Sequence, residues 1–382
     1  MVPVSDESPL SRARTLVTAH RGADGDSNRA QVAGIVLTRP GPVSWVIPGI
    51  NPPIDRTAAI DTVWVAIGPD SCTVITTEVE QRRVSEELLP AGVELVAVPW
   101  WDGQAMVSAA QQALGVSLEH IGSDGHPAFG HDLDHELTVT RLALNSDERV
   151  RLCTLGRLAT LAVEDALRSW QPGEADTEIA ARIAQGVERF GGDAPVLLVG
   201  ADDRLRRYRH PVAVGAPARE CVMAVLVARS RGLHVALTRY TACGDTAELE
   251  AGLDVTRSIH RDVLNAGRPD VTYGSVLETL ANSYAAHGHA GAWSEHYQGG
   301  PIGYAQREFE ISPAQQTSPW WDQLVHENTA VAWNPSVAGG LKDEDTYLIS
   351  ADGVHLVTDS AQWPMDSDPL LPRPLVLRRD DV

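Results

Sequence analysis

The sequence predicts a two-domain α+β protein, in which a smaller α/β domain over residues 1–144 precedes a larger domain over residues 145–382. A chain of 382 residues is long enough to bury two hydrophobic cores. Short β-type runs alternate with helical patterns as far as about Leu144, which is typical of an α/β layer. After Leu144 come long amphipathic helices, and then a closing third that is rich in β-type runs.

The first domain opens with a polar segment up to about Arg29, after which short runs of β-branched and apolar residues begin. Turns that contain Pro and Gly, at residues 39–42 and 68–70, separate some of these runs. Helices are expected over residues 80–88 and 104–114. The expected strands are residues 32–37, 44–47, 62–67, 72–76 and 93–98.

The second domain begins with Asn145-Ser-Asp-Glu148, whose polar side chains suit the first turn of a helix that runs to about Trp170. A second helix starts near Thr177 and places Ile179, Ile183 and Val187 along one stripe. Further helices are expected over residues 246–264 and 273–286. The expected strands are residues 196–199, 221–228, 233–237, 330–333 and 346–349.

Residues 122–136 are rich in Gly, Asp and His and are interpreted as a linker. His131 and His135 have the i, i+4 spacing that can clamp zinc on a helix, but the Glu that follows the first His in zincins is missing. The neighbouring residues also have a loop-like composition. A solvated linker is therefore favoured over a zinc site.

The formal net charge of −20 argues against nucleic acid or an anionic membrane as a partner, because both require basic patches. No apolar run approaches the ~18 residues that can span a bilayer, and the acidic N-terminal segment does not resemble a signal peptide. A cytoplasmic location is expected. The four cysteines show no Cys-x-x-Cys spacing and are interpreted as thiols in a reducing compartment: Cys72, Cys153, Cys221 and Cys243.

Three stretches of the last third, residues 296–304, 332–335 and 342–346, carry a family resemblance. They read His-Tyr-Gln-Gly-Gly-Pro-Ile-Gly-Tyr, Ala-Trp-Asn-Pro and Lys-Asp-Glu-Asp-Thr. These stretches resemble the pita-bread metallopeptidases, which include the Xaa-Pro aminopeptidases, prolidase and the metal-free relative creatinase. The resemblance implies a pita-bread domain over residues 145–382 and a creatinase/prolidase-type α/β domain over residues 1–144.

The resemblance also implies where the metal ligands of the peptidases would stand, and most of those positions lack a donor. Val225, Ala236 and Gly300 occupy three of them, and the amide Asn334 occupies a fourth. Glu344 alone keeps a carboxylate. Divalent ions need several close ionised or lone-pair donors, so neither a metal nor another cofactor is expected. Creatinase resembles this pattern, although it has a Glu where this chain has Thr238.

Polar side chains nevertheless gather in the same segments, and they are the candidate site. His210, in Arg-His-Pro, and Glu344 are the candidate catalytic residues, His210 as the general acid and base because imidazole titrates near neutral pH. Glu344 would stabilise a cationic group or set the protonation of an imidazole. The candidate substrate-binding residues are Arg239, His296, Gln298, Arg307, Glu308, Asn334 and Asp345.

The leading hypothesis is a metal-independent, creatinase-like enzyme that cleaves a C–N bond of a small polar molecule or short peptide, by hydrolysis or by elimination. One alternative is a non-catalytic protein that binds a peptide or metabolite in the same cleft. Another is an Xaa-Pro aminopeptidase with an altered metal site. The resemblance further implies a homodimer, in which the loop from Pro48 to Arg56 could help to close the partner's cleft through Asn51 and Arg56.

Overall fold

The computed structural model describes residues 6–20, 32–48, 54–337, 339, 341–368 and 371–379. The chain divides into two compact units, residues 1–141 and residues 142–382. Asn51 lies outside the described residues, and Arg56 lies in a turn. In the part of the chain that the structure describes, no helix is long and apolar enough to cross a membrane.

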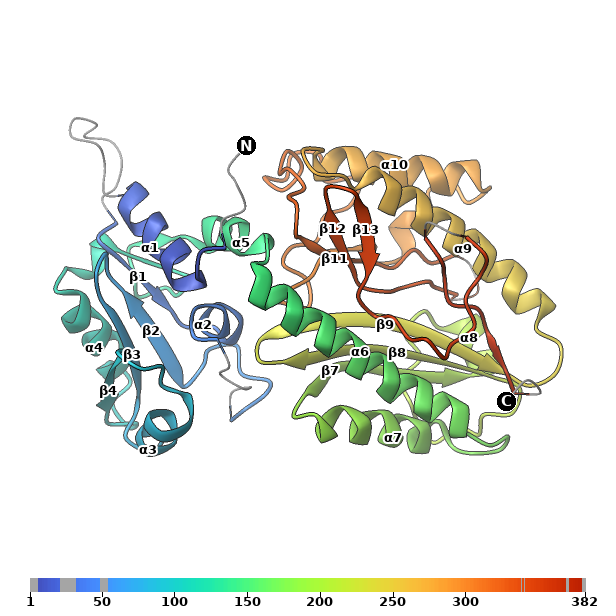
Figure 1. Ribbon diagram of the computed structural model, residues 1–382, viewed down its shortest axis with the longest axis horizontal. Coiled ribbons are helices and arrows are strands. Elements are labelled where there is room, and N and C mark those ends of the chain that lie inside the picture. Colours follow the sequence, from blue (N-terminus) through green and yellow to red (C-terminus); the bar gives the residue numbers. More distant parts are fainter. Residues whose placement is uncertain are drawn as a thin grey trace. The chain divides into compact units, whose positions relative to one another are not determined.

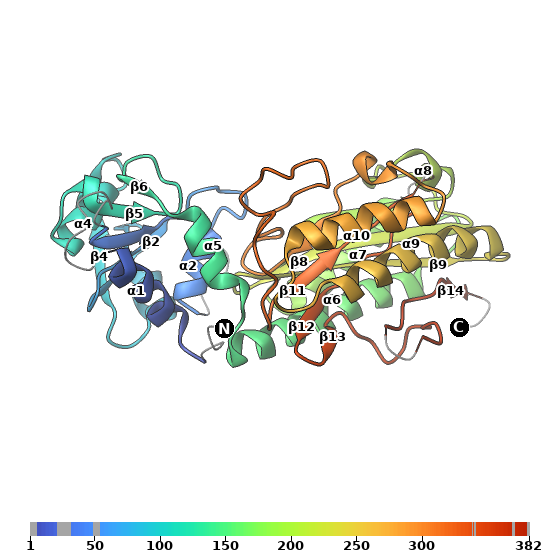
Figure 2. The same ribbon diagram turned by 90° about the horizontal axis from the view of Figure 1, so that it is seen from above.

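The first unit is built on a mixed six-stranded sheet in the order β4-β3-β2-β1-β5-β6. Val36, Ala66 and Ile75 pack with helix α4 (Ala105–Leu114) on one face of this sheet, and α1 (Pro9–His20) and α2 (Pro40–Val46) lie on the other face (Figures 1 and 2). The strands are β1 (Gly34–Leu37), β2 (Val63–Ile67), β3 (Cys72–Thr77), β4 (Glu94–Val98), β5 (Ile121–Ser123) and β6 (His131–Asp132). Short helical turns complete the unit: α3 (Gln81–Arg83), a π-helical turn at Val84–Leu88 and a 3₁₀ turn at Leu118–His120.

Two sequence-based predictions for this unit are wrong. Residues 44–47, expected as a strand after a turn, belong instead to α2 and its C-terminal cap. The reason is Pro40 at the start of that helix, where its fixed φ and missing N–H favour a helical first turn. Residues 122–136, expected as a linker, contain β5, β6 and the start of helix α5 (Asp134–Leu142). His131 lies in β6 and His135 in α5, so the two imidazoles do not share a helix face.

The second unit begins with helix α6 (Ser146–Ser169), which starts with the expected cap. The side chain of Asn145 accepts a hydrogen bond from the backbone N–H of Glu148, and the Glu148 carboxylate accepts one from the N–H of Asn145. Helices α6 and α7 (Asp176–Arg189) cover one face of a sheet in the order β14-β9-β8-β7 (Figure 1). Its strands are β7 (Asp193–Ala201), β8 (Cys221–Ser230), β9 (Leu233–Ala242) and β14 (Leu377–Arg378), with the short helix α8 (Asp203–Arg207) after β7.

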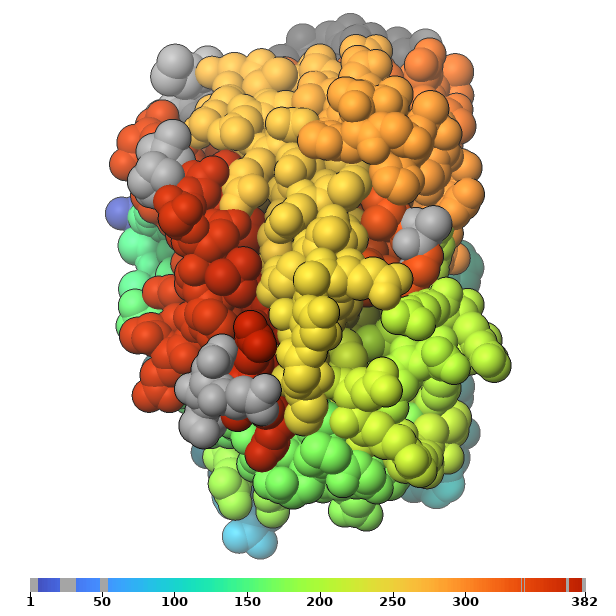
Figure 3. All heavy atoms as spheres, turned by 90° about the vertical axis from the view of Figure 1, so that its right-hand side faces the viewer, coloured from blue at the N-terminus to red at the C-terminus, as the bar shows by residue number. Residues whose placement is uncertain are grey.

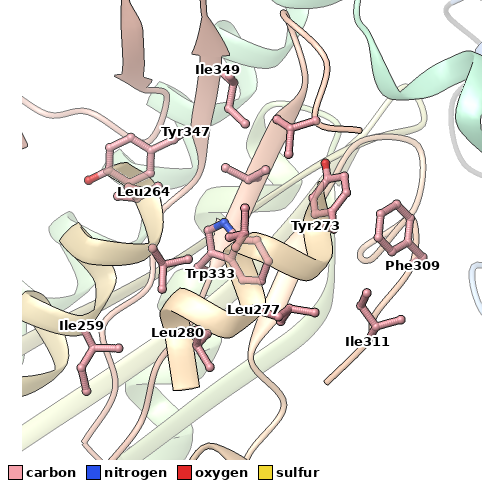
Figure 4. Close-up of a cluster of buried hydrophobic side chains, with 14 of the residues drawn as sticks. Ile259, Leu264, Tyr273, Leu277, Leu280, Phe309, Ile311, Trp333, Tyr347 and Ile349 are labelled. Atoms are coloured by element: carbon pink, nitrogen blue, oxygen red, sulfur yellow. The ribbon is translucent and has the colours of Figure 1, made fainter. Parts of the chain in front are cut away.

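A second four-stranded sheet, in the order β10-β11-β12-β13, packs against helices α9 (Ala247–Ala266) and α10 (Tyr273–Ala286). The core between them contains Leu277, Trp333 and Tyr347, and Figure 4 shows these side chains converging from three elements. At one side of this core Phe309 stacks on Trp320, with 4.2 Å between ring centroids. The strands are β10 (Gly299–Pro301), β11 (Ala330–Trp333), β12 (Tyr347–Ser350) and β13 (Gly353–Leu356), preceded by a 3₁₀ turn at Ala292–Glu295.

A buried imidazole in β9 makes the stability of this unit depend on pH. The Nδ1–H of His234 donates to the carbonyl oxygen of Gly303 over 3.0 Å, and burial lowers the pKa of His234 to about 4. The unfolded chain therefore takes up this proton below its ordinary pKa of 6.5, whereas the folded chain holds the ring neutral down to about 4. We expect the unfolding free energy to fall by up to roughly 3 kcal/mol between these two pH values. Urea titrations of the wild type and of His234→Gln at a series of pH values measure the unfolding free energy. The same dependence of this free energy on pH in the two proteins would contradict the prediction.

Candidate functional site

The floor of the candidate site is the face of the β7–β9 sheet that points away from α6. Successive side chains of a strand point to opposite faces, and residues directly paired across two antiparallel strands share a face. Val225 pairs with both Leu198 and Thr238, and Val227 pairs with Ala236. These side chains therefore share one face, over which a cavity of about 360 Å³ opens. The aliphatic residues that line this cavity are Val196, Leu198, Val225 and Val227.

The opposite wall comes from the extended segment 342–346, which runs beside β9. The N–H of Thr238 donates to the carbonyl oxygen of Glu344, and the N–H of Ala236 donates to Oγ1 of Thr346. Side-chain alternation then sends Lys342 and Glu344 to the cavity. The Glu344 carboxylate accepts from Nη2 of Arg307 over 2.9 Å and from Oγ1 of Thr238 over 3.5 Å. Thr238 thus supports the carboxylate of Glu344 from the sheet.

The same alternation sends Asp343 and Asp345 away from the cavity, into a buried network of charges. Arg373 donates to both carboxylates, over 2.7 Å to Oδ1 of Asp343 and 3.0 Å to Oδ2 of Asp345. Although burial raises it, Arg373 holds the pKa of Asp343 below its ordinary range. His260 adds a contact of 2.9 Å between its Nδ1 and Asp343.

Arg239 belongs to this network and does not line the cavity. It pairs with Ala224 across the sheet, on the face that α6 covers, and its guanidinium contacts Glu164 of α6. It also donates to Asp345 over 2.8 Å and to two backbone carbonyl oxygens. We therefore correct the assignment of Arg239 and Asp345 from substrate binding to the core, where each is 1% exposed or less.

Two histidines lie together beside the cavity: His210 lines it, and His296 lines an adjoining hollow. The rings of His210 and His296 lie 4.9 Å apart between centroids, and Tyr297 lies beside His210. Burial, together with the charges of Lys342 and Arg209, lowers the pKa of His210. Burial likewise lowers the pKa of His296 to about 3, with Lys342 acting in the same direction. Both imidazoles are therefore neutral at neutral pH, and in the described part of the chain neither ring nitrogen of His296 has a hydrogen-bond partner.

The two amide residues of the predicted site differ in how much of their hydrogen bonding is already used. Gln298 donates to the carbonyl oxygens of Trp293 and His296 and accepts from the hydroxyl of Tyr284, so it holds a loop in place. Asn334 lines the cavity, and its buried Oδ1 has no partner among the described residues. Asn334 is thus the amide that remains available to a ligand.

Arg307 and Glu308, adjacent in the chain, have separate roles. Arg307 lines the cavity and binds Glu344, whereas Glu308 accepts from the backbone N–H groups of Tyr304 and Ala305. Those contacts brace the turn after β10 and turn the carboxylate of Glu308 toward the backbone. We accordingly correct Glu308 from a substrate-binding to a loop-supporting residue.

The structure adds four polar cavity residues that the sequence-based prediction missed: Tyr297, Gln306, Glu310 and Lys342. Glu310 accepts from the N–H of Gly299, and burial raises the pKa of its carboxyl, although Arg307 opposes this. Burial lowers the pKa of Lys342 to about 8, while Glu344 acts in the opposite direction. Lys342 could have been found from its spacing, because it lies two residues before Glu344 in an extended segment.

A wider hollow of about 780 Å³ adjoins this cavity and shares His210, Tyr297 and Glu310 with it. Another hollow, of about 690 Å³, is lined by the segment after β7 and by the start of α9, both of which face the viewer in Figure 3. There Asp202 accepts from three backbone N–H groups and Arg206 pairs with Glu248. Of these three hollows, the first cavity alone is lined by Asn334, Lys342 and Glu344, and His210 lies where it adjoins the wider hollow, so the first cavity is the candidate site.

A pair of divalent ions does not fit the donor set of the candidate site. Val225 and Ala236 have no donor atoms, and among the described residues no group of three or more His, Cys, Asp and Glu side chains could hold a metal ion. Gly300 has φ of +147°, which side chains of L-residues rarely adopt, and a Cβ on Gly299 would lie 2.1 Å from the carbonyl oxygen of Ala332. The backbone at this turn therefore disfavours the histidine of the resemblance.

Comparisons with known proteins confirm the predicted fold class. The profile of metallopeptidase family M24 matches residues 152–352. The chain is similar to the prolidase of Pyrococcus horikoshii OT3, with 14% identity, a TM-score of 0.70, and coverage of 95% of this chain and 99% of that chain. It is also similar to an Xaa-Pro dipeptidase of Bacillus anthracis, with 16% identity, a TM-score of 0.69, and coverage of 97% of this chain and 99% of that chain. The dipeptidase PepE of Mycobacterium ulcerans is similar as well, with 17% identity, a TM-score of 0.71, and coverage of 97% of this chain and 98% of that chain. A comparison with curated proteins gave no match.

Proposed function

Because this chain belongs to metallopeptidase family M24, we propose that it is an enzyme that cleaves a C–N bond of a small polar substrate without a metal ion. The observation that carries the proposal is the composition of the cavity. Aliphatic side chains form its floor, with Val225 at a position where the resemblance requires a carboxylate, and the imidazole of His210 lines its edge. Such a cavity suits proton transfer by a side chain better than Lewis-acid chemistry.

His210 is the proposed general acid and base. A neutral imidazole can take a proton from an attacking water molecule, or from carbon in an elimination, and can return it to the departing nitrogen. The lowered pKa of His210 keeps the ring neutral at pH 7, as the first step requires. The ring of His296 lies beside it, 4.9 Å away between centroids and tilted by 31°.

The other cavity residues bind and orient the substrate in this proposal. Glu344 holds Arg307 in place through the 2.9 Å contact, so its role is to fix a cationic group rather than to transfer a proton. Asn334 offers its free amide oxygen to an N–H group of the substrate. A homodimer that closes the cavity stays a prediction from the resemblance.

The pH dependence of turnover tests the role of His210. Protonated imidazole cannot act as a base, so kcat/KM is expected to fall as the pH falls through a pKa below 6.5. A pH–rate profile of the full chain measures this acidic limb. A limb centred above pH 6.5 would contradict the assignment, because the environment of His210 lowers its pKa.

A substrate survey in the presence of EDTA tests the proposed function itself. The full chain would be offered Xaa-Pro dipeptides, N-acyl amino acids and amidino carboxylates, with release of amine or ammonia as the signal. The proposal expects turnover of one of these classes, unchanged by EDTA. Turnover that appears only after addition of Mn²⁺, Co²⁺ or Zn²⁺ would refute metal independence, and tight binding without turnover would refute catalysis.

A further inference from the structure

Lys342 is the only lysine in the chain, so all other members of its 31 basic residues are arginines. This one lysine is placed in the candidate site and is 1% exposed. Its backbone is held on both sides: the hydroxyl of Tyr240 donates to the Lys342 carbonyl oxygen and accepts from its N–H. The side chain is thereby aimed into the cavity from a fixed segment.

The ammonium group of Lys342 is not held by any residue in the part of the chain that the structure describes. None of the hydrogen bonds or ion pairs within 4.0 Å that link described residues involves its Nζ. Glu344 lines the same cavity, but its carboxylate is already bound by Arg307 and Thr238. Lys342 faces the cavity, so the acceptor atoms that its ammonium needs come from water or from a molecule bound there.

The charges around Lys342 favour an anionic ligand at this point. Two cations, Lys342 and Arg307, and two carboxylates, Glu344 and Glu310, line the cavity. Glu344 is paired with Arg307 and Glu310 accepts from the N–H of Gly299, so among the described residues Lys342 is the lining cation that forms no ion pair. Across the cavity lie the four aliphatic side chains of the floor, Val196, Leu198, Val225 and Val227. A ligand that satisfies both sides carries an anionic oxygen group at one end and an apolar group at the other.

We propose that the cavity binds a small carboxylate with an apolar group, and that the ammonium of Lys342 is the main anchor for the carboxylate. The proposal rests on the proposed function, since it names the substrate class of the same site. In this proposal the lysine supplies the positive charge in the cavity. Charge-assisted hydrogen bonds of this kind are the stronger ones in proteins, and here they form away from water.

A matched pair of probes tests the anchor. 4-Methylpentanoate and 4-methylpentanamide have nearly the same shape, and only the first is charged. Calorimetric titration of the full chain in EDTA is expected to show at least about tenfold tighter binding of the acid. Acetate, which lacks the apolar group, is expected to bind more weakly than 4-methylpentanoate. Equal binding of acid and amide, or of acid and acetate, would overturn the proposal.

Variants at position 342 complete the test. Lys342→Met is expected to abolish the preference for the acid, whereas Lys342→Arg retains a cation and keeps most of it. Arg206→Met, which removes an exposed cation outside the cavity, is the control and leaves the preference unchanged. Retention of the preference in Lys342→Met would refute the anchor.

The single lysine also allows a test without substitution. Acylation of amines by an N-hydroxysuccinimide ester can be followed at Lys342 on one peptide, with the α-amine of the expressed chain as the internal reference. 4-Methylpentanoate is expected to slow the acylation of Lys342 and the amide is not; equal protection by both would contradict the proposal. Neither result bears on the role of His210, which the pH–rate profile tests. The anchor at Lys342 and the proposed catalytic function can therefore fail independently.

Discussion

Replacement of His210 by asparagine is expected to lower kcat by about 10²- to 10⁴-fold on any substrate that the chain turns over. Asparagine keeps a polar side chain at the cavity edge but cannot accept and return a proton near neutral pH. The substrate contacts assigned to Arg307, Asn334 and Lys342 remain, so KM is expected to change little. Steady-state kinetics at saturating substrate measure the effect.

His355→Asn is the matched control for this experiment. His355 lies on β13, where its ring contacts Ser350 and Asp352, and its side chain is exposed. Its replacement is expected to leave kcat unchanged. Wild-type kcat in His210→Asn would remove the imidazole from the mechanism, and a loss in both variants would indicate a general effect on the fold.

The replacement Arg373→Met is expected to lower the unfolding free energy by about 3–5 kcal/mol. The guanidinium is fully buried and neutralises Asp343 and Asp345, while also donating to the hydroxyl of Tyr347. Methionine fills a similar volume but removes the guanidinium that both carboxylates share, and leaves Asp345 with Arg239 and the hydroxyl of Thr358, and Asp343 with His260. Urea or guanidinium titration with a structural probe measures the loss.

Arg206→Met is the appropriate control for stability as well as for binding. Arg206 lies at the surface, and its pairs with Asp203 and Glu248 are exposed to solvent. Exposed pairs contribute 1 kcal/mol or less, so the unfolding free energy is expected to stay within roughly 0.5 kcal/mol of the wild type. Similar stability of Arg373→Met and the wild type would show that the buried charges compensate one another without Arg373.

The side-chain directions in the segment 342–346 could be predicted from the sequence alone. The resemblance located Glu344, and the period of two in an extended chain was sufficient to place Lys342 on the same side and Asp343 and Asp345 on the other. The same alternation places the side chains of Thr238 and Arg239 on opposite faces of β9. The prediction that Glu344, Asp345 and Arg239 share one cleft was wrong for the last two, because each is one residue out of phase with the side chains that face the cavity.

Other features could not be predicted in this way, since they depend on partners distant in the chain. Arg239 contacts Glu164, 75 residues away, and Thr358, 119 residues away. The roles of Gln298 and Glu308 follow from loop conformation, which residue type does not determine. The apolar floor was anticipated from Val225 and Ala236, but its continuation through Val196 and Leu198 required the pairing of β7 with β8.

The metal content of the purified full chain tests the central claim most directly. The protein would be produced in medium supplemented with Mn²⁺, Co²⁺ and Zn²⁺, purified without chelators and measured by plasma mass spectrometry. An aliphatic floor with one retained carboxylate predicts far less than one metal ion per chain, and no rise in thermal stability when these ions are added back. One or two ions per chain, retained through gel filtration and lost together with stability in EDTA, would contradict the account.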